Sequence, residues 1–194
     1  DFEIGLKDFK SKFMTTLSKG SGLLDSTTIA NQGLAIEQLS TQLTKMFTSK
    51  SRMKAMVGKP SIDFNYENHK GGKTSLKDLK GKYVYIDLWA TWCGPCKKEI
   101  PFLKEVELKY HNKNIEFVSI SVDKNKEAWK KMVKDKKLGG IQLHYGNNND
   151  LSEAYEVTGI PRFILLDNKG NIVDPNAPRP SSPKLIELLK EQGI

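Results

Sequence analysis

From Tyr83 onward, short apolar runs alternate along the chain with segments of helical periodicity. The run 83–89 is almost wholly apolar, which predicts a strand buried on both faces, and 95–110 has a helical pattern interrupted by Pro101. Asn168-Lys169-Gly170 predicts a closing antiparallel hairpin. The fold class is therefore α/β, with a mixed central sheet flanked by helices. The other predicted strands are 115–122, 141–145, 163–167 and 171–174, and the other helices are 123–137, 151–157 and 183–192.

The pattern before Tyr83 changes at Lys59-Pro60. Ile62–Tyr66 alternates apolar and polar residues, which predicts a half-exposed strand. Gly71-Gly72 predicts a turn, and a second extended piece follows to Leu76. We therefore expect an extra N-terminal β-hairpin in a main domain of residues 58–194, preceded by a helical N-terminal extension of residues 1–57.

Within residues 1–57, apolar residues recur at helical spacing in two stretches, which predicts two amphipathic helices. Asp25 or Ser26 is the predicted N-cap of the second helix. We expect these helices to cover the core of the main domain, to be the remnant of a larger N-terminal region, or to form a dimer or partner-docking face. The apolar stripes are Leu6, Phe9, Phe13 and Leu17, and then Ile29, Ile36, Leu39, Leu43, Met46 and Phe47.

Hydropathy and charge exclude two classes of protein. The longest runs of large apolar residues are about four long, whereas a membrane-spanning helix needs ~20, so no transmembrane segment is predicted in this sequence. The net charge of +8 is divided evenly between residues 1–60 and the rest. No basic cluster is interleaved with aromatic residues, so nucleic acid is not an expected partner.

The chain has two cysteines, Cys93 and Cys96. One pair is too few for a disulfide-stapled scaffold, and no second Cys or His pair completes a structural zinc site. His69, His111 and His144 are scattered singly and are expected to be surface or packing residues. No metal site is therefore predicted.

The two cysteines stand between a buried strand and the start of a helix. A thiol attacks only as the thiolate, and the unpaired N–H groups and dipole at a helix N-terminus stabilise that charge on Cys93. Pro95 suits the first helical turn because its φ is preset and its missing N–H would have no partner there. We predict that Cys93 lies at an exposed helix mouth as the nucleophile, and that Cys96, one turn inside, resolves the mixed disulfide.

The stretch Trp92-Cys93-Gly94-Pro95-Cys96 is similar to the active site of thioredoxins. The longer segment 81–101 resembles the TlpA/ResA-like branch, whose members are bacterial, membrane-tethered or periplasmic thiol–disulfide oxidoreductases. The hairpin region and Gly159-Ile160-Pro161 match this branch as well. The resemblance covers 58–194, implies a thioredoxin fold there, and does not extend to residues 1–57.

The resemblance also implies roles for residues outside the cysteine pair. Pro161 matches the cis-proline that faces the dithiol, and Ile160 offers backbone hydrogen bonds to a substrate chain. Asp87 matches the buried acid that relays a proton to the inner cysteine, with a pKa raised by burial; the alternative is an acid at the surface end of its strand. Glu99 matches an active-site glutamate of ResA-like members, and the alternative is an exposed helix residue.

Residues around the dithiol form the implied substrate-binding set. Trp92 gives a flat apolar platform beside Cys93, and Gly94 and Pro95 form the spacer. Arg162 departs from the family, because many members have Thr at this position. Its guanidinium either lies near the dithiol, where it lowers the pKa of Cys93 or selects acidic partner segments, or points along the strand edge into solvent.

Together these features predict an enzyme that exchanges electrons between the Cys93–Cys96 dithiol and disulfide-containing protein substrates. The redox-active disulfide is the expected redox group, with no further cofactor. The expected electron donor is a membrane or periplasmic dithiol, and the expected location is the periplasm or its membrane face.

Three other activities are alternatives to this one. The Gly-Pro spacer resembles that of reducing thioredoxins, but a more oxidising, disulfide-forming protein stays open, as does a copper-binding thioredoxin-like module. Direct peroxide reduction is not expected, because Ile86 and Ala90 replace the proline and the threonine or serine of the peroxiredoxin motif.

Overall fold

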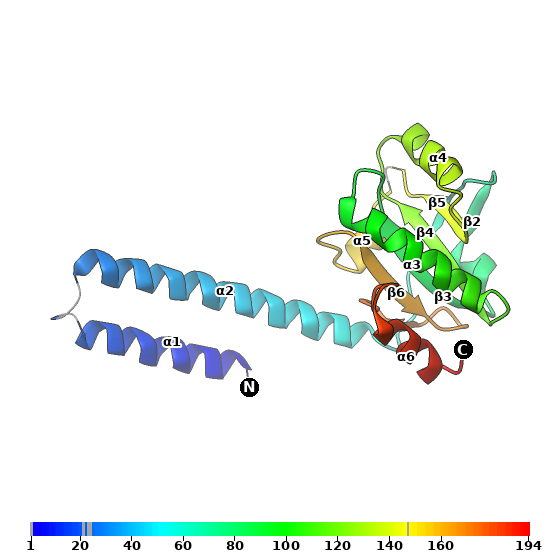
Figure 1. The fold of residues 1–194 in the computed structure, drawn as a ribbon. Helices are drawn as coiled ribbons and strands as arrows, with labels where there is room; N and C mark the ends of the chain where they lie inside the picture. Colours follow the sequence, from blue (N-terminus) through cyan, green and yellow to red (C-terminus); the bar gives the residue numbers. More distant parts are fainter. Residues whose placement is uncertain (1, 21, 23–24, 147) are drawn as a thin grey trace. The chain divides into compact units, whose positions relative to one another are not determined.

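A computed structural model of the chain describes residues 2–20, 22, 25–146 and 148–194. The chain forms two compact units, Asp1–Arg52 and Met53–Ile194 (Figure 1). Among the helices of the described residues, none combines the length and the apolar character needed to cross a lipid bilayer. The helices are α1 (Phe2–Lys19), α2 (Ser26–Met56), η1 (Leu76–Leu79, 3₁₀), α3 (Gly94–Tyr110), α4 (Lys126–Asp135), α5 (Asp150–Ala154) and α6 (Pro183–Glu191). The strands are β1 (Asn65–Asn68), β2 (Lys73–Ser75), β3 (Tyr83–Trp89), β4 (Ile115–Ser121), β5 (Ile141–His144), β6 (Arg162–Leu166) and β7 (Ile172–Asp174).

The N-terminal unit is an antiparallel hairpin of α1 and α2. The rings of Phe2 and Phe47 stack with their centroids 4.2 Å apart, and Lys10 forms an ion pair with Glu37. Because the early residue of α1 meets the later residue of α2, the two helices run in opposite directions. The predicted helical extension is confirmed.

The start of α2 and the exposure of the two stripes refine that prediction. Asp25 is the N-cap, since the Thr28 backbone N–H donates to Asp25 Oδ1 at 2.8 Å. Leu17 is buried, whereas Phe9 and Leu39 are exposed. Burial of the predicted apolar residues is therefore uneven.

The second unit is built on one seven-stranded mixed sheet of order β2-β1-β5-β4-β3-β6-β7. β3, β4 and β5 are parallel neighbours, and β6 pairs antiparallel with both β3 and β7. At the other edge, β1 pairs antiparallel with β2 and β5. The order of strands and helices agrees with the predicted α/β fold, including both hairpins.

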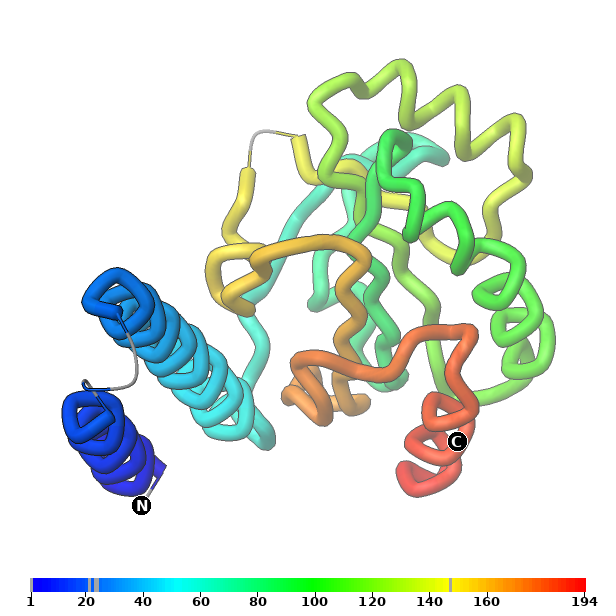
Figure 2. The backbone as a smooth tube through the Cα atoms, turned by 60° about the vertical axis from the view of Figure 1, so that its left-hand side comes forward, coloured from blue at the N-terminus to red at the C-terminus, as the bar shows by residue number. Residues whose placement is uncertain are grey.

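The interior strand β3 divides the core into two layers. Val84, Ile86 and Leu88 face a cluster that includes residues of β1, η1 and α5. Tyr85, between them on the opposite face, joins a cluster formed with α3 and α6. In Figure 2, α3 and α6 lie on one side of the strands and α5 lies on the other. The strand is buried on both faces, as predicted.

The first predicted strand begins later than expected. Residues 62–64 lie outside β1, so the prediction was wrong there. The Ser61 N–H donates to Gly170 O at 2.9 Å, and Phe64 O accepts from Leu76 N at 3.2 Å. The backbone on either side of this segment thus bonds to loop and helix-start residues.

Predictions for three helices also need correction. α3 is continuous through Pro101, with no interruption of its helical residues. α4 begins at Lys126, because the Asn125 side chain accepts from the Ala128 N–H at 3.0 Å and caps the helix there. α5 ends at Ala154 instead of reaching Val157, since Glu156 takes a left-handed φ of 47°.

Candidate active site

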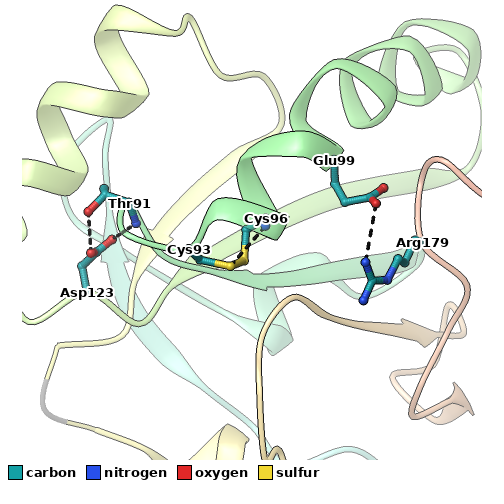
Figure 3. The surroundings of a disulfide bond; sticks show 6 residues. All are labelled: Thr91, Cys93, Cys96, Glu99, Asp123 and Arg179. Carbon is teal, nitrogen blue, oxygen red and sulfur yellow. Dashed lines mark hydrogen bonds and ion pairs between the residues drawn. A yellow bond between two sulfur atoms is a disulfide. The ribbon is translucent and has the colours of Figure 1, made fainter.

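The cysteine pair lies where β3 leads into α3 (Figure 3). Cys93 is the N-cap of α3, Gly94 is its first residue, and Pro95 occupies the first turn. Cys93 and Cys96 form a disulfide, and Cys93 Sγ accepts a hydrogen bond from the Cys96 backbone N–H at 3.1 Å. A backbone N–H that has no acceptor within the helix therefore points at the Cys93 sulfur, where it can stabilise the charge of a thiolate.

Both sulfurs are more enclosed than the sequence predicts. The expectation of an exposed helix mouth at Cys93 is wrong, because Cys93 is only 4% exposed, close to the 3% of Cys96. The pair belongs to an apolar cluster with Trp89, Ala90, Trp129 and Val133, against which Ile160 also packs. Trp92, by contrast, is 68% exposed and presents the large apolar surface beside the disulfide.

Asp123 holds the loop that carries Trp92 and Cys93 (Figure 3). Its two carboxylate oxygens accept from the Thr91 backbone N–H at 2.9 Å and from Thr91 Oγ1 at 2.7 Å. The Ser121 hydroxyl donates to the same carboxylate at 2.7 Å. Asp123 is not among the site residues predicted from the sequence. The parallel pairing of β3 with β4 nevertheless indicates that Asp123 lies close to Thr91. Trp89 pairs with Ser121 across β3 and β4, so residues two positions further along both strands are expected to meet.

We expect Asp123→Ala to lower the free energy of unfolding of the second unit by about 3 kcal/mol, because it leaves two Thr91 donors without their charged acceptor. The chain's three tryptophans, Trp89, Trp92 and Trp129, all lie in this unit, so urea unfolding followed by tryptophan fluorescence reports on it alone. Asp135→Ala, at an exposed position on α4, is the matched control. A loss below about 0.5 kcal/mol would remove Asp123 from its holding role.

Asp87 lies on β3, six positions before Cys93, and is 8% exposed, so the alternative of a surface-end acid is wrong. Within the described residues, its Oδ1 atom has no hydrogen-bond partner. Burial raises the pKa of this carboxyl to about 8, and the nearby charge of Glu99 adds to the rise. The Ser119 hydroxyl acts in the opposite direction. This acid can accept and return a proton near neutral pH.

Glu99 is buried in the second turn of α3 beyond Cys96, so the alternative of an exposed helix residue is wrong. Its carboxylate accepts from the Ser181 backbone N–H and from Ser181 Oγ, both at 3.0 Å. Arg179 Nη1 lies 3.9 Å from Glu99 Oε1 (Figure 3). Glu99 thus ties α3 to the proline-rich segment that precedes α6.

The peptide bond between Ile160 and Pro161 is cis, as the resemblance implies. Arg162 follows, and the residue is 9% exposed, with its Nη1 donating to Pro175 O at 3.3 Å. A side chain pointing into solvent is therefore excluded for Arg162. Arg162 and Phe163 are neighbours on β6, so they lie on opposite faces of the sheet, in agreement with strand alternation. Phe163 belongs to the core cluster formed with α3 and α6, and Arg162 does not.

The histidines do not gather around a metal. His144 stacks on Trp129 with centroids 5.0 Å apart, and His69 meets the same ring edge-on. His111 is exposed at the end of α3. In the part of the chain that the structure describes, no three Cys, His, Asp or Glu side chains group as metal ligands.

Comparison with known proteins agrees with this geometry. Residues 81–172 match the thioredoxin-like family. The chain is 31% identical over 145 residues to the thiol-disulfide oxidoreductase ResA of Bacillus thuringiensis subsp. konkukian, covering 75% of this chain and 82% of that protein. A ResA of Bacillus cereus is 34% identical over 128 residues, covering 66% of this chain and 72% of that protein.

Solved structures show the same likeness. A solution structure of a Bacteroides vulgatus protein is 55% identical with a TM-score of 0.64, covering 70% of this chain and 90% of that one. The thioredoxin domain of a thiol-disulfide oxidoreductase from the same species is 30% identical with a TM-score of 0.64, covering 70% and 96%.

Proposed function

The chain belongs to the thioredoxin-like family of ResA-type thiol–disulfide oxidoreductases, and from this premise we propose that it reduces disulfide bonds of protein substrates outside the cytoplasm. The observation that carries the proposal is the Cys93–Cys96 disulfide at the start of α3, in the same unit as a buried acid with a pKa of about 8. The Gly-Pro spacer, similar to that of reducing thioredoxins, supports the direction. The resemblance to membrane-tethered and periplasmic members supports the compartment.

In the first step, the reduced Cys93 thiolate attacks one sulfur of the substrate disulfide. A mixed disulfide forms between Cys93 and the substrate, and the other substrate sulfur leaves as a thiolate. The Cys96 N–H that lies 3.1 Å from Cys93 Sγ, together with the helix dipole, stabilises the negative charge of the reduced Cys93 thiolate.

In the second step, Asp87 takes the proton from the Cys96 thiol, and the Cys96 thiolate attacks Cys93 Sγ. The internal disulfide forms, and the second substrate sulfur leaves as a thiolate. The substrate has gained two electrons and the protein has lost two. Glu99 contributes by holding the first turns of α3 against Ser181 and by its charge near Asp87.

The cycle closes when a membrane or periplasmic dithiol protein attacks the Cys93–Cys96 disulfide and returns the two electrons. Substrate and donor then approach the same surface. On this surface, Trp92 supplies an exposed apolar platform, and Gly94 and Pro95 contact the bound chain. The backbone of Ile160, beside Pro161, offers hydrogen bonds to it. Arg162 does not enter this set, because its guanidinium is held at Pro175 O.

A redox titration of the Cys93–Cys96 couple against glutathione tests the direction. We expect a midpoint potential of about −270 mV, the value typical of reducing thioredoxins. Insulin reduction with a dithiol donor should accompany it. A midpoint of about −120 mV, typical of disulfide-forming proteins, would contradict a reductive role.

A further inference from the structure

A small cavity under α3 joins the buried Asp87 to a second acid, Glu107. Asp87, Trp89, Ser119 and Gln142 form its buried walls on the sheet. Glu107 is half-buried and stands with Gly139 at the less buried part of the lining. The two acids therefore occupy the deep and the outer parts of one space.

The buried walls of this cavity carry polar atoms that need a partner. Asp87 Oδ1, Trp89 Nε1 and Gln142 Oε1 are buried and lack a hydrogen-bond partner within the described residues. The cavity volume available to the centre of a water molecule is about 10 Å³, close to the roughly 10–15 Å³ that one bound water needs. One water there would have acceptors and a donor around it and would connect the two ends of the cavity.

Two glycines, Gly139 and Gly140, leave the space that the Glu107 carboxyl occupies. A Cβ added to Gly139 would overlap with Glu107 Oε2, and one added to Gly140 would lie 2.9 Å from Glu107 Oε1. Gly140 also has a φ of +59°, which L side chains rarely adopt. The start of β5 thus leaves space that the carboxyl occupies.

From this shared cavity we propose that Glu107 is a positioning residue that carries the Asp87 proton between the buried site and solvent. The inference rests on the proposed function. When Cys96 is oxidised, its proton passes to Asp87, then through the cavity to the ionised Glu107, and from there to bulk water. When the donor reduces the disulfide, the same proton path runs in reverse.

The pKa values of the two acids suit this relay. Burial raises the pKa of Glu107 to about 7 and that of Asp87 to about 8, so both carboxyls can take up and release a proton near neutral pH. The charge of Glu99 on α3 also acts on Asp87, and the charge of Asp87 acts on Tyr85 of β3. The ammonium of Lys104 acts on Glu107 and favours its ionised form.

The test follows one oxidation of the reduced full chain by the aromatic disulfide dithiobis(nitrobenzoate) near pH 8. The first thiolate released reports attack by Cys93, and the second reports resolution by Cys96. A pH-indicator dye in weak buffer records the Cys96 proton as it reaches solvent. In the wild type, the dye trace should coincide with the second thiolate release.

In Glu107→Gln, the dye trace should lag the second thiolate release, or that release itself should slow, by at least about tenfold. Gly139→Ala should act in the same direction because it displaces the carboxyl. Glu105→Gln, an exposed position on the same helix, is the matched control and should leave both traces unchanged. Glu107→Asp should restore part of the rate.

Two outcomes separate the inference from its premise. Coincident traces at wild-type rates in both Glu107→Gln and Gly139→Ala would overturn the role of Glu107 and leave the cysteine chemistry intact. A wild-type protein that releases no second thiolate would instead contradict the proposed function. Unfolding midpoints of the variants, followed by tryptophan fluorescence, check that each is folded, since a merely structural role would change stability without separating the traces.

Discussion

Cys93→Ser is expected to abolish exchange with a disulfide substrate, whereas Cys96→Ser is expected to accumulate a stable mixed disulfide through Cys93. The two sulfurs are almost equally buried, so access alone does not distinguish them. The helix N-terminus does, because Cys93 is the N-cap and receives the Cys96 N–H at 3.1 Å. A serine hydroxyl at position 93 stays protonated near neutral pH and does not replace the thiolate.

Mass spectrometry of each variant after incubation with a peptide disulfide measures this difference. The double variant with serine at both positions should show no adduct. Alkylation of the reduced wild type provides an independent measurement, and Cys93 should be modified first. If Cys96 reacts first and faster, the roles of the two cysteines are reversed.

Asp87→Asn is expected to stabilise the second unit by about 4 kcal/mol at pH 7, because the wild type must bury a carboxyl whose ionised form is disfavoured. The folded-state pKa of about 8 lies above the ordinary value of 3.8. Between these two values the folded protein binds more protons than the unfolded chain, so wild-type stability falls as pH rises from about 4 to about 8. Asparagine does not titrate, and the gain should vanish below about pH 4.

Urea unfolding across this pH range, followed by tryptophan fluorescence, measures the effect. Asp135→Asn is the control, since its carboxyl is exposed and its pKa is lowered by Lys131. A gain that is independent of pH would show that Asp87 is not the titrating group.

The same Asp87→Asn substitution should slow resolution by Cys96 by about 10²-fold, within the usual range for loss of a general base. Attack by Cys93 should keep its rate. Single-turnover kinetics separate the two steps, and the wild-type resolution rate should increase with pH through about 8 as Asp87 ionises. An unchanged resolution rate in Asp87→Asn would exclude it from proton transfer.

Much of this architecture is predictable from local sequence patterns. The interior strand Tyr83–Trp89 and a helix that starts within the cysteine motif follow from an apolar run, a proline at the first turn and the cysteine spacing. Both are decided by residues close together in the chain, so local periodicity and capping preferences suffice.

Contacts between distant residues were not predictable in the same way. The burial of Cys93 depends on Trp129 of α4 and on Ile160, and the burial of Glu99 depends on Ser181. The buried guanidinium of Arg162 donates a hydrogen bond to Pro175 O, and strand alternation does not predict this contact. Such partners depend on tertiary packing, which a single sequence without known pairings does not determine.

The tie between Glu99 and Ser181 affects how the molecule is made. Ser181 follows Glu99 by 82 residues, so a ribosome has added all of them before the Glu99 carboxylate can meet its partner. Ala177, Leu185 and Leu189, which complete the core layer beneath α3, belong to the same late part of the chain. A nascent chain therefore carries its two thiols without their finished surroundings until the segment around Ser181 has been synthesised. During this time we expect the two thiols to be accessible to cysteines of other proteins. The Cys93–Cys96 disulfide is therefore expected to form correctly once the segment up to Leu189 has been synthesised and has folded against α3.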